Sequence, residues 1–161
     1  MTPETADKQF KSDLEKLRAI ANEDRAVVLN PIRAHAMAIV SREGSAIWLN
    51  ENRVPHRTHV FGLPIDAPAV IKLNGDREYY SNGQFWRRNN RAPIVRASGV
   101  REWVVGSWRD EKPRHQGPIM ACGVPGPAIV YPDGLVIYVD LEGKYLMEDQ
   151  WTPKEAADYF K

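Results

Sequence analysis

The chain has 161 residues, with 22 basic and 21 acidic side chains and a formal net charge of +1 at pH 7. This length suits one domain with a hydrophobic core, so we expect residues 1–161 to form a single domain. The near-neutral charge excludes a field over the whole chain that would draw it onto nucleic acid or an anionic membrane. The single cysteine excludes an internal disulfide framework and a multi-cysteine metal site, which favours a reducing compartment.

Residues 1–30 are interpreted as an N-terminal helical segment. We predict a helix from about residue 3 to residue 21, because apolar residues recur there at helical spacing: Phe10, Leu14, Leu17 and Ile20. This segment lacks the apolar core of a signal peptide, and no uncharged apolar run approaches the roughly 18 residues of a membrane span. We therefore expect a cytoplasmic protein that has no membrane partner.

Residues 36–147 contain an internal repeat. Three units, which start at residues 67, 92 and 126, each open with a small residue, a proline and two apolar residues. Each unit continues with a glycine, an aromatic residue four positions later and a second glycine: Gly75, Tyr79 and Gly83; Gly99, Trp103 and Gly106; Gly134, Tyr138 and Gly143. Residues 36–39, Gly44 and Trp48 form a fourth unit with the same offsets, which predicts a strand at 36–41 rather than a helix.

Each unit is predicted to be a β-hairpin. A proline suits the start of a strand, where its missing N–H costs least. The pairs Asn74-Gly75 and Asp133-Gly134 supply the positive φ angles that a tight hairpin turn needs, and the aromatic-rich return strand follows. The chain is therefore expected to form a meander of repeated hairpins.

Side chains alternate across a strand, so Arg77 and Tyr79 should share one face of the sheet while Glu78 and Tyr80 share the other. Arg101 and Trp103 repeat this arrangement one unit later. Stacked units would place four aromatic rings in a ladder whose cross-strand contacts contribute on the order of 0.2 to 1 kcal/mol each. These rings are Trp48, Tyr79, Trp103 and Tyr138.

The C-terminus is predicted to form a short helix at 152–161. Thr152 suits the N-cap, Pro153 the first helical position and Glu155 the capping-box glutamate, and the helix should reach Phe160. The expected fold class is α+β and mainly β, with the hairpin meander between the N-terminal helix and this short C-terminal helix. We expect both helices to cap the open ends of the sheet.

The order of small residue, proline, apolar pair, Asp/Asn-Gly, aromatic residue and Asn-Gly resembles the degenerate MORN-like hairpin repeats of phage, giant-virus and bacterial proteins. The resemblance covers roughly residues 36–147, and residues 56–57 and 114–118 carry traces of the His-Arg and Gly-Pro signals of that family. It implies a binding scaffold of stacked hairpins with no built-in activity. It also implies a phage or viral accessory factor, such as an inhibitor of a host protein or a virion component, that acts in the host cytoplasm.

Residues that could carry chemistry are sparse. His56 and His59 lie in a proline-flanked loop without a second cluster of ligands, so no metal is expected. His115 is interpreted as a solvated side chain in a turn, and Cys122 as a buried, inert thiol in an apolar strand-like stretch. A hydrolase or transferase built on these histidines and Cys122 is the weakest of the alternatives.

Known catalytic and nucleotide-binding patterns are missing from the sequence. It contains no P-loop, no dinucleotide-binding glycine motif and no nucleophile elbow. Glu78 and Glu102 occupy equivalent positions in two repeats, which explains them better than an acid–base pair does. We therefore expect a non-enzymatic protein with no cofactor.

An arginine–aromatic patch is the strongest binding signal, and it comprises Phe85, Trp86, Arg87, Arg88, Arg91, Trp108 and Arg109. Trp, Tyr and Arg dominate protein hot spots, while rings beside arginines also suit a groove for single-stranded nucleic acid. The third interpretation is an ordinary surface in which one of the rings Phe85 and Trp86 enters the core. We predict an adaptor that binds another protein (host, viral or a second copy of itself) through its repeated hairpin surface, with nucleic-acid binding as the alternative.

Overall fold

The computed structural model describes residues 27–29, 37–40, 44–50, 52–60 and 63–161. This part of the chain is mainly β, an antiparallel meander with one short C-terminal helix. The helix predicted at residues 3–21 lies outside the described residues. The helical segment predicted at 1–30 is wrong at its end, where Val27–Leu29 forms a strand. None of the helices in the described residues is long and apolar enough to cross a membrane.

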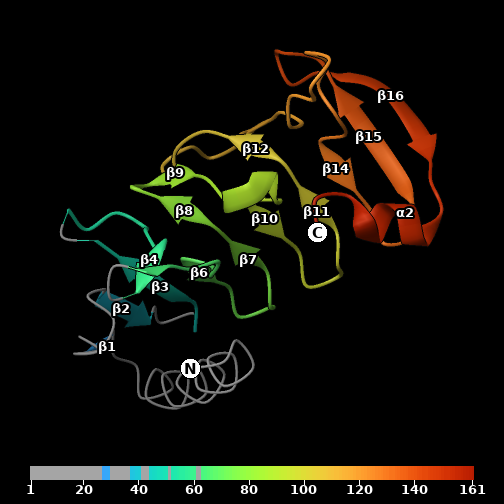
Figure 1. Ribbon diagram of the computed structural model, residues 1–161. Coiled ribbons are helices and arrows are strands. Elements are labelled where there is room, and N and C mark those ends of the chain that lie inside the picture. The colour runs from blue at the N-terminus through green and yellow to red at the C-terminus, as the bar shows by residue number, and fades with distance from the viewer. Residues whose placement is uncertain (1–26, 30–36, 41–43, 51, 61–62) are drawn as a thin grey trace.

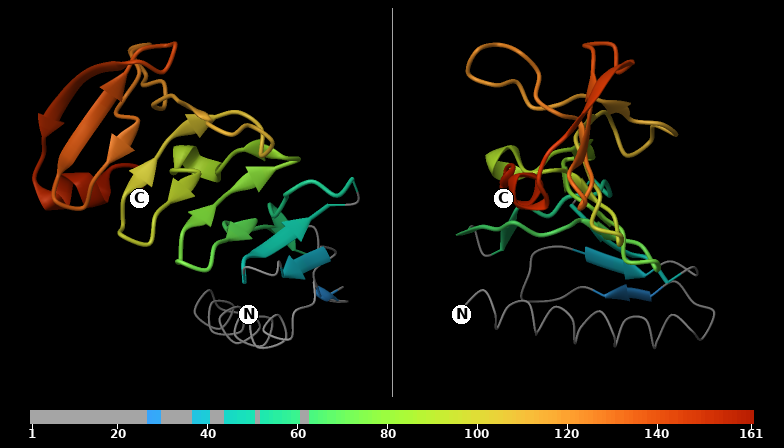
Figure 2. Two further views of the ribbon diagram at one scale, coloured as in Figure 1. Left: turned by 180° about the vertical axis from the view of Figure 1, so that it is seen from behind. Right: turned by 90° about the vertical axis from the view of Figure 1, so that its right-hand side faces the viewer.

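Ten of the described strands form one antiparallel sheet in which spatial order follows chain order (Figure 1). The strands are β1 (Val27–Leu29), β2 (Met37–Val40), β3 (Ala46–Leu49), β6 (Val70–Ile71), β7 (Arg77–Glu78), β10 (Ile94–Val95), β11 (Arg101–Glu102), β14 (Ile129–Val130), β15 (Leu135–Val139) and β16 (Tyr145–Gln150). The sheet twists along its length, so the first and last strands run in clearly different directions in the right-hand view of Figure 2.

Short ribbons and turns connect the hairpins of the sheet. The ribbons pair β4 (His59–Val60) with β5 (Leu63–Pro64), β8 (Tyr80–Ser81) with β9 (Gln84–Phe85), and β12 (Val104–Val105) with β13 (Arg114–His115). A single 3₁₀ turn spans Arg88–Asn90, and helix α2 spans Pro153–Asp158. Strands β8, β9 and β12 lie at one end of the hairpins, opposite the tight turns that join β6 to β7 and β10 to β11 (Figure 1).

The four predicted repeat units are antiparallel hairpins. They are β2–β3, β6–β7, β10–β11 and β14–β15. The strand expected at residues 36–41 is β2, which pairs with β3 as the repeat predicted. The offsets of the glycine and aromatic residues therefore identified even the unit that lacks a proline.

The turns of the last three units are three-residue loops, each closed by two backbone hydrogen bonds. The Lys72 N–H donates to the Asp76 carbonyl oxygen at 2.9 Å, and the Gly75 N–H donates to the Lys72 carbonyl oxygen at 2.9 Å. The same two bonds close the turns at Gly99 and Gly134. Only the glycine adopts a positive φ, 96° at Gly75, and Asn74 does not. The turn thus has a glycine bulge, whereas the sequence had predicted positive φ angles at both residues of the Asn-Gly pair.

Successive hairpins are joined by a hydrogen bond from the aromatic residue of each unit. The backbone N–H groups of Trp48, Tyr79 and Trp103 donate to the carbonyl oxygens of Ala69, Pro93 and Ala128 at 2.8, 2.7 and 2.7 Å. These three rings are buried and Tyr138 is half-buried. No ring contact joins any two of these four described residues, so the predicted ladder of aromatic contacts is wrong. A guanidinium lies near each of the three buried rings, because the guanidinium carbons of Arg57, Arg87 and Arg101 lie 4.0, 3.9 and 5.6 Å from the ring centroids of Trp48, Tyr79 and Trp103.

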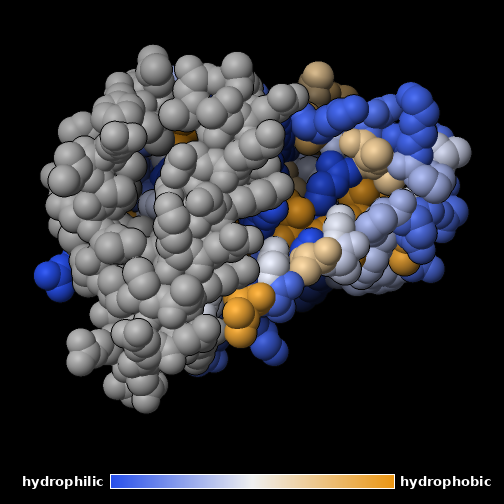
Figure 3. Space-filling model, turned by 90° about the horizontal axis from the view of Figure 1, so that it is seen from below, coloured by the Kyte–Doolittle hydropathy of each residue, from blue (hydrophilic) through white to orange (hydrophobic). Residues whose placement is uncertain are grey.

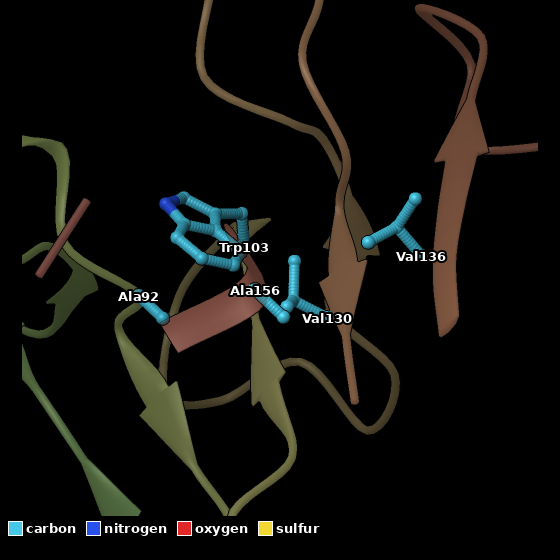
Figure 4. Packing of buried hydrophobic residues seen from close by; sticks show 5 residues of the cluster. All are labelled: Ala92, Trp103, Val130, Val136 and Ala156. Atoms are coloured by element: carbon cyan, nitrogen blue, oxygen red, sulfur yellow. The ribbon is translucent and has the colours of Figure 1, made fainter. Parts of the chain in front are cut away.

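Helix α2 packs on the sheet face that carries the aromatic positions. Its Ala156 lies beside Trp103 and Val130, with Ala92 and Val136 completing a buried cluster (Figure 4). The ring of Tyr159, just beyond the helix, lies 5.0 Å from that of Trp103 and 5.3 Å from that of Trp151. The last turn of the chain therefore closes the core at this end of the sheet.

The predicted helix cap is confirmed. The Thr152 hydroxyl accepts a hydrogen bond from the Glu155 N–H at 3.1 Å and donates one to the Glu155 carboxylate at 3.0 Å. The cap residue and the first-turn glutamate thus bind each other, as in a capping box. The helix ends at Asp158, two residues before the predicted end at Phe160.

Substitution of Gly134 tests the packing of the repeated turn. Gly134 has a φ of 101°, and a Cβ atom there would lie 2.0 Å from the backbone oxygen of Trp151. We expect Gly134→Ala to lower the free energy of unfolding by about 3 kcal/mol or more, because the clash adds to about 1–2 kcal/mol of left-handed backbone strain. Gly123→Ala is the matched control, since Gly123 has a φ of 79° but no described atom within 4 Å of the added Cβ. Urea unfolding followed by tryptophan fluorescence measures both, and equal losses would contradict the close packing.

Candidate functional site

Two arginines of the predicted patch bind one carboxylate. Arg87 donates from Nε and Nη2 to the two oxygens of Asp66 at 2.8 and 2.9 Å, and Arg91 donates from Nη1 at 2.8 Å. Burial alone would raise the pKa of Asp66, but the hydrogen bonds and charges of the two arginines outweigh it and hold that pKa below its usual value. The pair anchors the long connection before β6, and no local sequence signal pointed to Asp66.

The guanidinium of Arg87 has further contacts inside the protein. It lies over the buried ring of Tyr79, and its Nη1 donates to the Ala92 carbonyl oxygen at 3.1 Å. Arg91 donates from Nε to the carbonyl oxygen of Lys161 at 2.9 Å. These two members of the patch therefore hold the fold together, whatever else they bind.

The aromatic members of the patch are half-buried or exposed. Phe85 packs on Tyr80 with 4.4 Å between ring centroids, while Trp86 is 48% exposed. Trp108 is 40% exposed, and its backbone N–H donates to the Gly83 carbonyl oxygen at the tip of the β8–β9 ribbon. The guanidinium carbon of Arg109 lies 5.3 Å from the Trp108 ring centroid, and Arg88 is half-buried in the 3₁₀ turn. Binding by these residues stays a prediction.

The two glutamates of the repeat lie on one face of the sheet, on either side of Ile94. Glu78 and Glu102 both pair with Ile94, one from each neighbouring strand, and they are 8% and 9% exposed. Glu78 lies 3.6 Å from the Lys72 ammonium and accepts a hydrogen bond from the Tyr80 hydroxyl at 3.4 Å. Each of these two buried carboxylates thus has a basic side chain of the same protein within ion-pair distance, Lys72 for Glu78 and Arg96 for Glu102.

Glu102 belongs to a chain of four charged or titratable groups. It accepts hydrogen bonds from Arg96 Nε and, at 2.8 Å, from His115 Nε2, while Arg96 Nη1 donates to Asp76 at 3.2 Å. The hydrogen bond from His115, aided by Arg96, outweighs burial and holds the pKa of Glu102 below its usual value. His115 therefore lies in strand β13 beside a carboxylate, and the prediction of a solvated histidine in a turn was wrong.

The opposite face carries the two arginines of the repeat. Arg77 and Arg101 both pair with Val95, again one from each neighbouring strand. Arg101 donates to the carbonyl oxygens of Ala156 and Tyr159 at the end of α2, and burial together with the charge of Arg87 lowers its pKa. Arg77 is exposed. In the described part of the chain, no carboxylate forms an ion pair with either guanidinium.

A groove of about 460 Å³ lies over this face, between the sheet and α2. Figure 3 shows the hollow, in which strongly hydrophilic side chains lie beside apolar ones. Tyr79, Val95 and Phe160 contribute apolar surface. Its basic residues are Arg77, Arg87, Arg91, Arg101 and Lys161, and no aspartate or glutamate is among the described residues that line it.

The remaining reactive side chains of the described residues are two histidines that meet at Thr58 and a cysteine in a separate turn. Thr58 Oγ1 lies 3.2 Å from His56 Nε2 and 2.8 Å from His59 Nδ1, and burial, with the charge of His59, lowers the pKa of His56. Cys122 is exposed in a turn, so the prediction of a buried thiol was wrong. Within the described residues, no group of three or more His, Cys, Asp or Glu side chains could hold a metal ion.

Strand β16 forms the last edge of the sheet, and all six of its residues are exposed. Four large apolar side chains of the β15–β16 hairpin are each more than half exposed: Leu141, Tyr145, Leu146 and Met147. We call these four residues the edge patch. A register shift opposite Tyr138 and Val139 makes Leu146 the extra residue of a bulge.

No protein-family model, curated protein or solved structure matches this chain. The hairpins themselves are present in the structure, whereas the MORN-like assignment stays a prediction from the repeat pattern. Function must therefore be argued from the surfaces and networks of the chain itself.

The lowered pKa of Glu102 predicts a loss of stability in acid. Its carboxylate contributes stability that is present above the usual glutamate pKa and is lost as the pH falls through the lower folded value. At pH 7 we expect Glu102→Gln to lower the free energy of unfolding by about 1.5–3 kcal/mol, the range for hydrogen bonds to charged groups. The variant should also lose less stability than the wild type below about pH 5. Urea unfolding across this pH range measures both effects, with exposed Glu111→Gln as the control. Parallel pH profiles for wild type and Glu102→Gln would contradict the network.

Proposed function

We propose that this protein is a non-enzymatic binding protein that engages another protein through the edge patch on the β15–β16 hairpin. The observation that carries the proposal is an open outermost strand whose apolar side chains face solvent. Such an edge offers unpaired backbone donors and acceptors to an incoming strand, and the side chains supply area to bury.

The edge is protected only in part where the apolar residues lie. Natural sheets guard exposed edges with lysine, proline, inward charges or β-bulges, and here Lys144 precedes the apolar run and Leu146 forms a bulge, yet Tyr145, Leu146 and Met147 follow one another without a charge. The acidic residues Glu148 and Asp149 come only at the far end of the strand. An apolar centre with a polar rim is the usual anatomy of a protein interface.

The interior charges support a role without catalysis. Glu102, Arg96 and His115 bind one another, and Arg87 and Arg91 are held by Asp66. Each of these contacts stabilises the scaffold. The MORN-like pattern favours the same role, and under this proposal the chain is a phage or viral accessory factor that acts on a partner in the host cytoplasm.

Nucleic acid is the alternative partner. The exposed rings of Trp86 and Trp108 favour it, because bases stack on such rings and Arg88 and Arg109 lie beside them in sequence. Arg87 and Arg91 are bound to Asp66, so fewer cations are free for phosphates than the sequence suggested.

A pull-down from native lysate, with and without nuclease, tests the partner class. We expect one stoichiometric protein that survives nuclease and whose yield falls at least tenfold for a Leu146→Glu, Met147→Glu double variant. The charges would be buried without partners in the complex but stay in water in the free protein. The matched control is Leu73→Glu, because Leu73 is equally exposed but lies in the β6–β7 turn.

Other outcomes of this experiment would contradict the proposal. Retention of the protein partner by the double variant would place the interface elsewhere, and Trp86→Ala and Trp108→Ala would then test the arginine–aromatic patch. Recovery of only nuclease-sensitive material would move the function to nucleic acid. If the captured protein is a second copy of this chain, sedimentation velocity would show a dimer that the double variant loses.

A further inference from the structure

The row of residues beneath the groove carries two arginines among apolar residues, as the row on the opposite face carries two glutamates. On this face, the strand register places Ala46, Ile71, Arg77, Val95, Arg101, Val130 and Val136 side by side across consecutive strands. Five of the seven positions are apolar, and the two arginines interrupt them. Both arginines forfeit apolar packing there, and the half-buried Arg101 also loses hydration; such local conflicts mark functional sites.

The two faces of the sheet differ in how their charges are neutralised. The same Arg-Glu pair occurs in β7 and in β11, so each strand sends its acid to one face and its base to the other. On the acid face, Lys72, Arg96 and His115 lie within ion-pair distance of the two glutamates. On the groove face, none of the described carboxylates pairs with Arg77 or Arg101.

Positive charge therefore accumulates in the groove. Five basic side chains line it, and among the described side chains the one carboxylate that binds any of them is Asp66, which Arg87 and Arg91 share. Arg101 is satisfied by backbone carbonyls, which carry no net charge. The lowered pKa of Arg101, caused by burial and by the nearby Arg87, reflects the same excess of cations.

The positions of Arg77 and Arg101, the two arginines of the sheet beneath the groove, suit one shared anion. They flank Val95 from the neighbouring strands, so their backbones lie about 10 Å apart, two strand spacings of about 4.8 Å. From that separation the exposed Arg77 side chain can reach a group above Val95, while both Nη atoms of Arg101 already donate to carbonyl oxygens at the end of α2, so Arg101 contributes its charge. Guanidinium forks match phosphate oxygens, and a phosphate dianion matches two cations where a carboxylate matches one.

The rest of the groove suits a flat or apolar body attached to that anion. Tyr79, Tyr131, Pro132 and Phe160 contribute to its walls. Its volume of about 460 Å³ falls within the 300–1,000 Å³ range of small-molecule sites. We propose that the groove binds a phosphate monoester with an aromatic body, such as a nucleotide, and that Arg77 holds the phosphate above Val95 while the neighbouring Arg101 adds a second positive charge.

This site requires neither a glycine-rich phosphate loop nor the proposed protein partner. The donors are side-chain guanidinium groups, so the missing P-loop and dinucleotide-binding motifs are no obstacle. The edge patch lies on β15–β16, away from the residues that line the groove. The two proposals can therefore fail separately.

Calorimetric titration at low ionic strength with AMP, adenosine and inorganic phosphate tests the site. We expect saturable binding of AMP, weaker binding of phosphate and no binding of adenosine. Arg77→Gln should weaken AMP binding at least tenfold, and Arg77→Lys should restore part of it, because lysine keeps the charge but loses the fork. Arg77 is exposed, so this variant should fold, which circular dichroism checks.

Control variants separate this site from other surfaces. Arg109→Gln removes an exposed arginine outside the groove and should leave AMP affinity unchanged. The Leu146→Glu, Met147→Glu variant should also bind AMP normally, so loss of the protein partner and loss of the ligand are distinguishable. Arg101→Gln also removes the contacts to the end of α2, so Arg77 is the decisive position.

Four results would overturn the proposal. They are failure of AMP to bind the wild type saturably, equal AMP affinity of wild type and Arg77→Gln, equal affinity for adenosine and AMP, and an acidic peptide such as pentaglutamate binding at least as tightly as AMP. The first two results would show that the groove does not bind AMP through Arg77. The third would show that it binds the apolar body without the phosphate, and the last that it binds carboxylates.

Discussion

The left-handed glycine that closes each repeated hairpin is the constraint on which the rest of the structure depends. Gly75, Gly99 and Gly134 each end a three-residue loop with the same two backbone hydrogen bonds, and this loop sets which residues pair across the strands. Because side chains alternate, a slip of one residue would move every side chain to the other face of the sheet. The short strands have few other bonds with which to resist such a slip.

The register explains both the stability networks and the candidate site. It sends Glu78 and Glu102 to the face where Lys72, Arg96 and His115 neutralise them. It sends the adjacent arginines to the other face, where α2 and the sheet form a groove that has an excess of positive charge. The Arg-Glu pair, which occurs in the same register in β7 and in β11, thus places neutralised glutamates on one face of the sheet and arginines that a ligand can reach on the other.

The sequence predicted what depends on local residues. The hairpins, their glycine positions, the strand at 36–41, the cap of α2 and the faces of the Arg-Glu pairs all follow from spacing, and the structure confirms them. It did not predict contacts between distant segments. Asp66 reaches Arg87 and Arg91 from the long connection, and His115 meets Glu102 only because β13 folds back on β12. The edge patch and the groove depend on which strands end the sheet and where α2 packs, which no repeat pattern shows.

Cross-strand nuclear Overhauser contacts measured in solution test the register most directly. The account predicts that backbone protons of Val95 show contacts to both Arg77 and Arg101, while those of Ile94 show contacts to both Glu78 and Glu102. Contacts displaced by one residue, such as Val95 to Glu78 and Glu102, would contradict the account, because the arginines would then leave the groove and the glutamates would lose their internal cations.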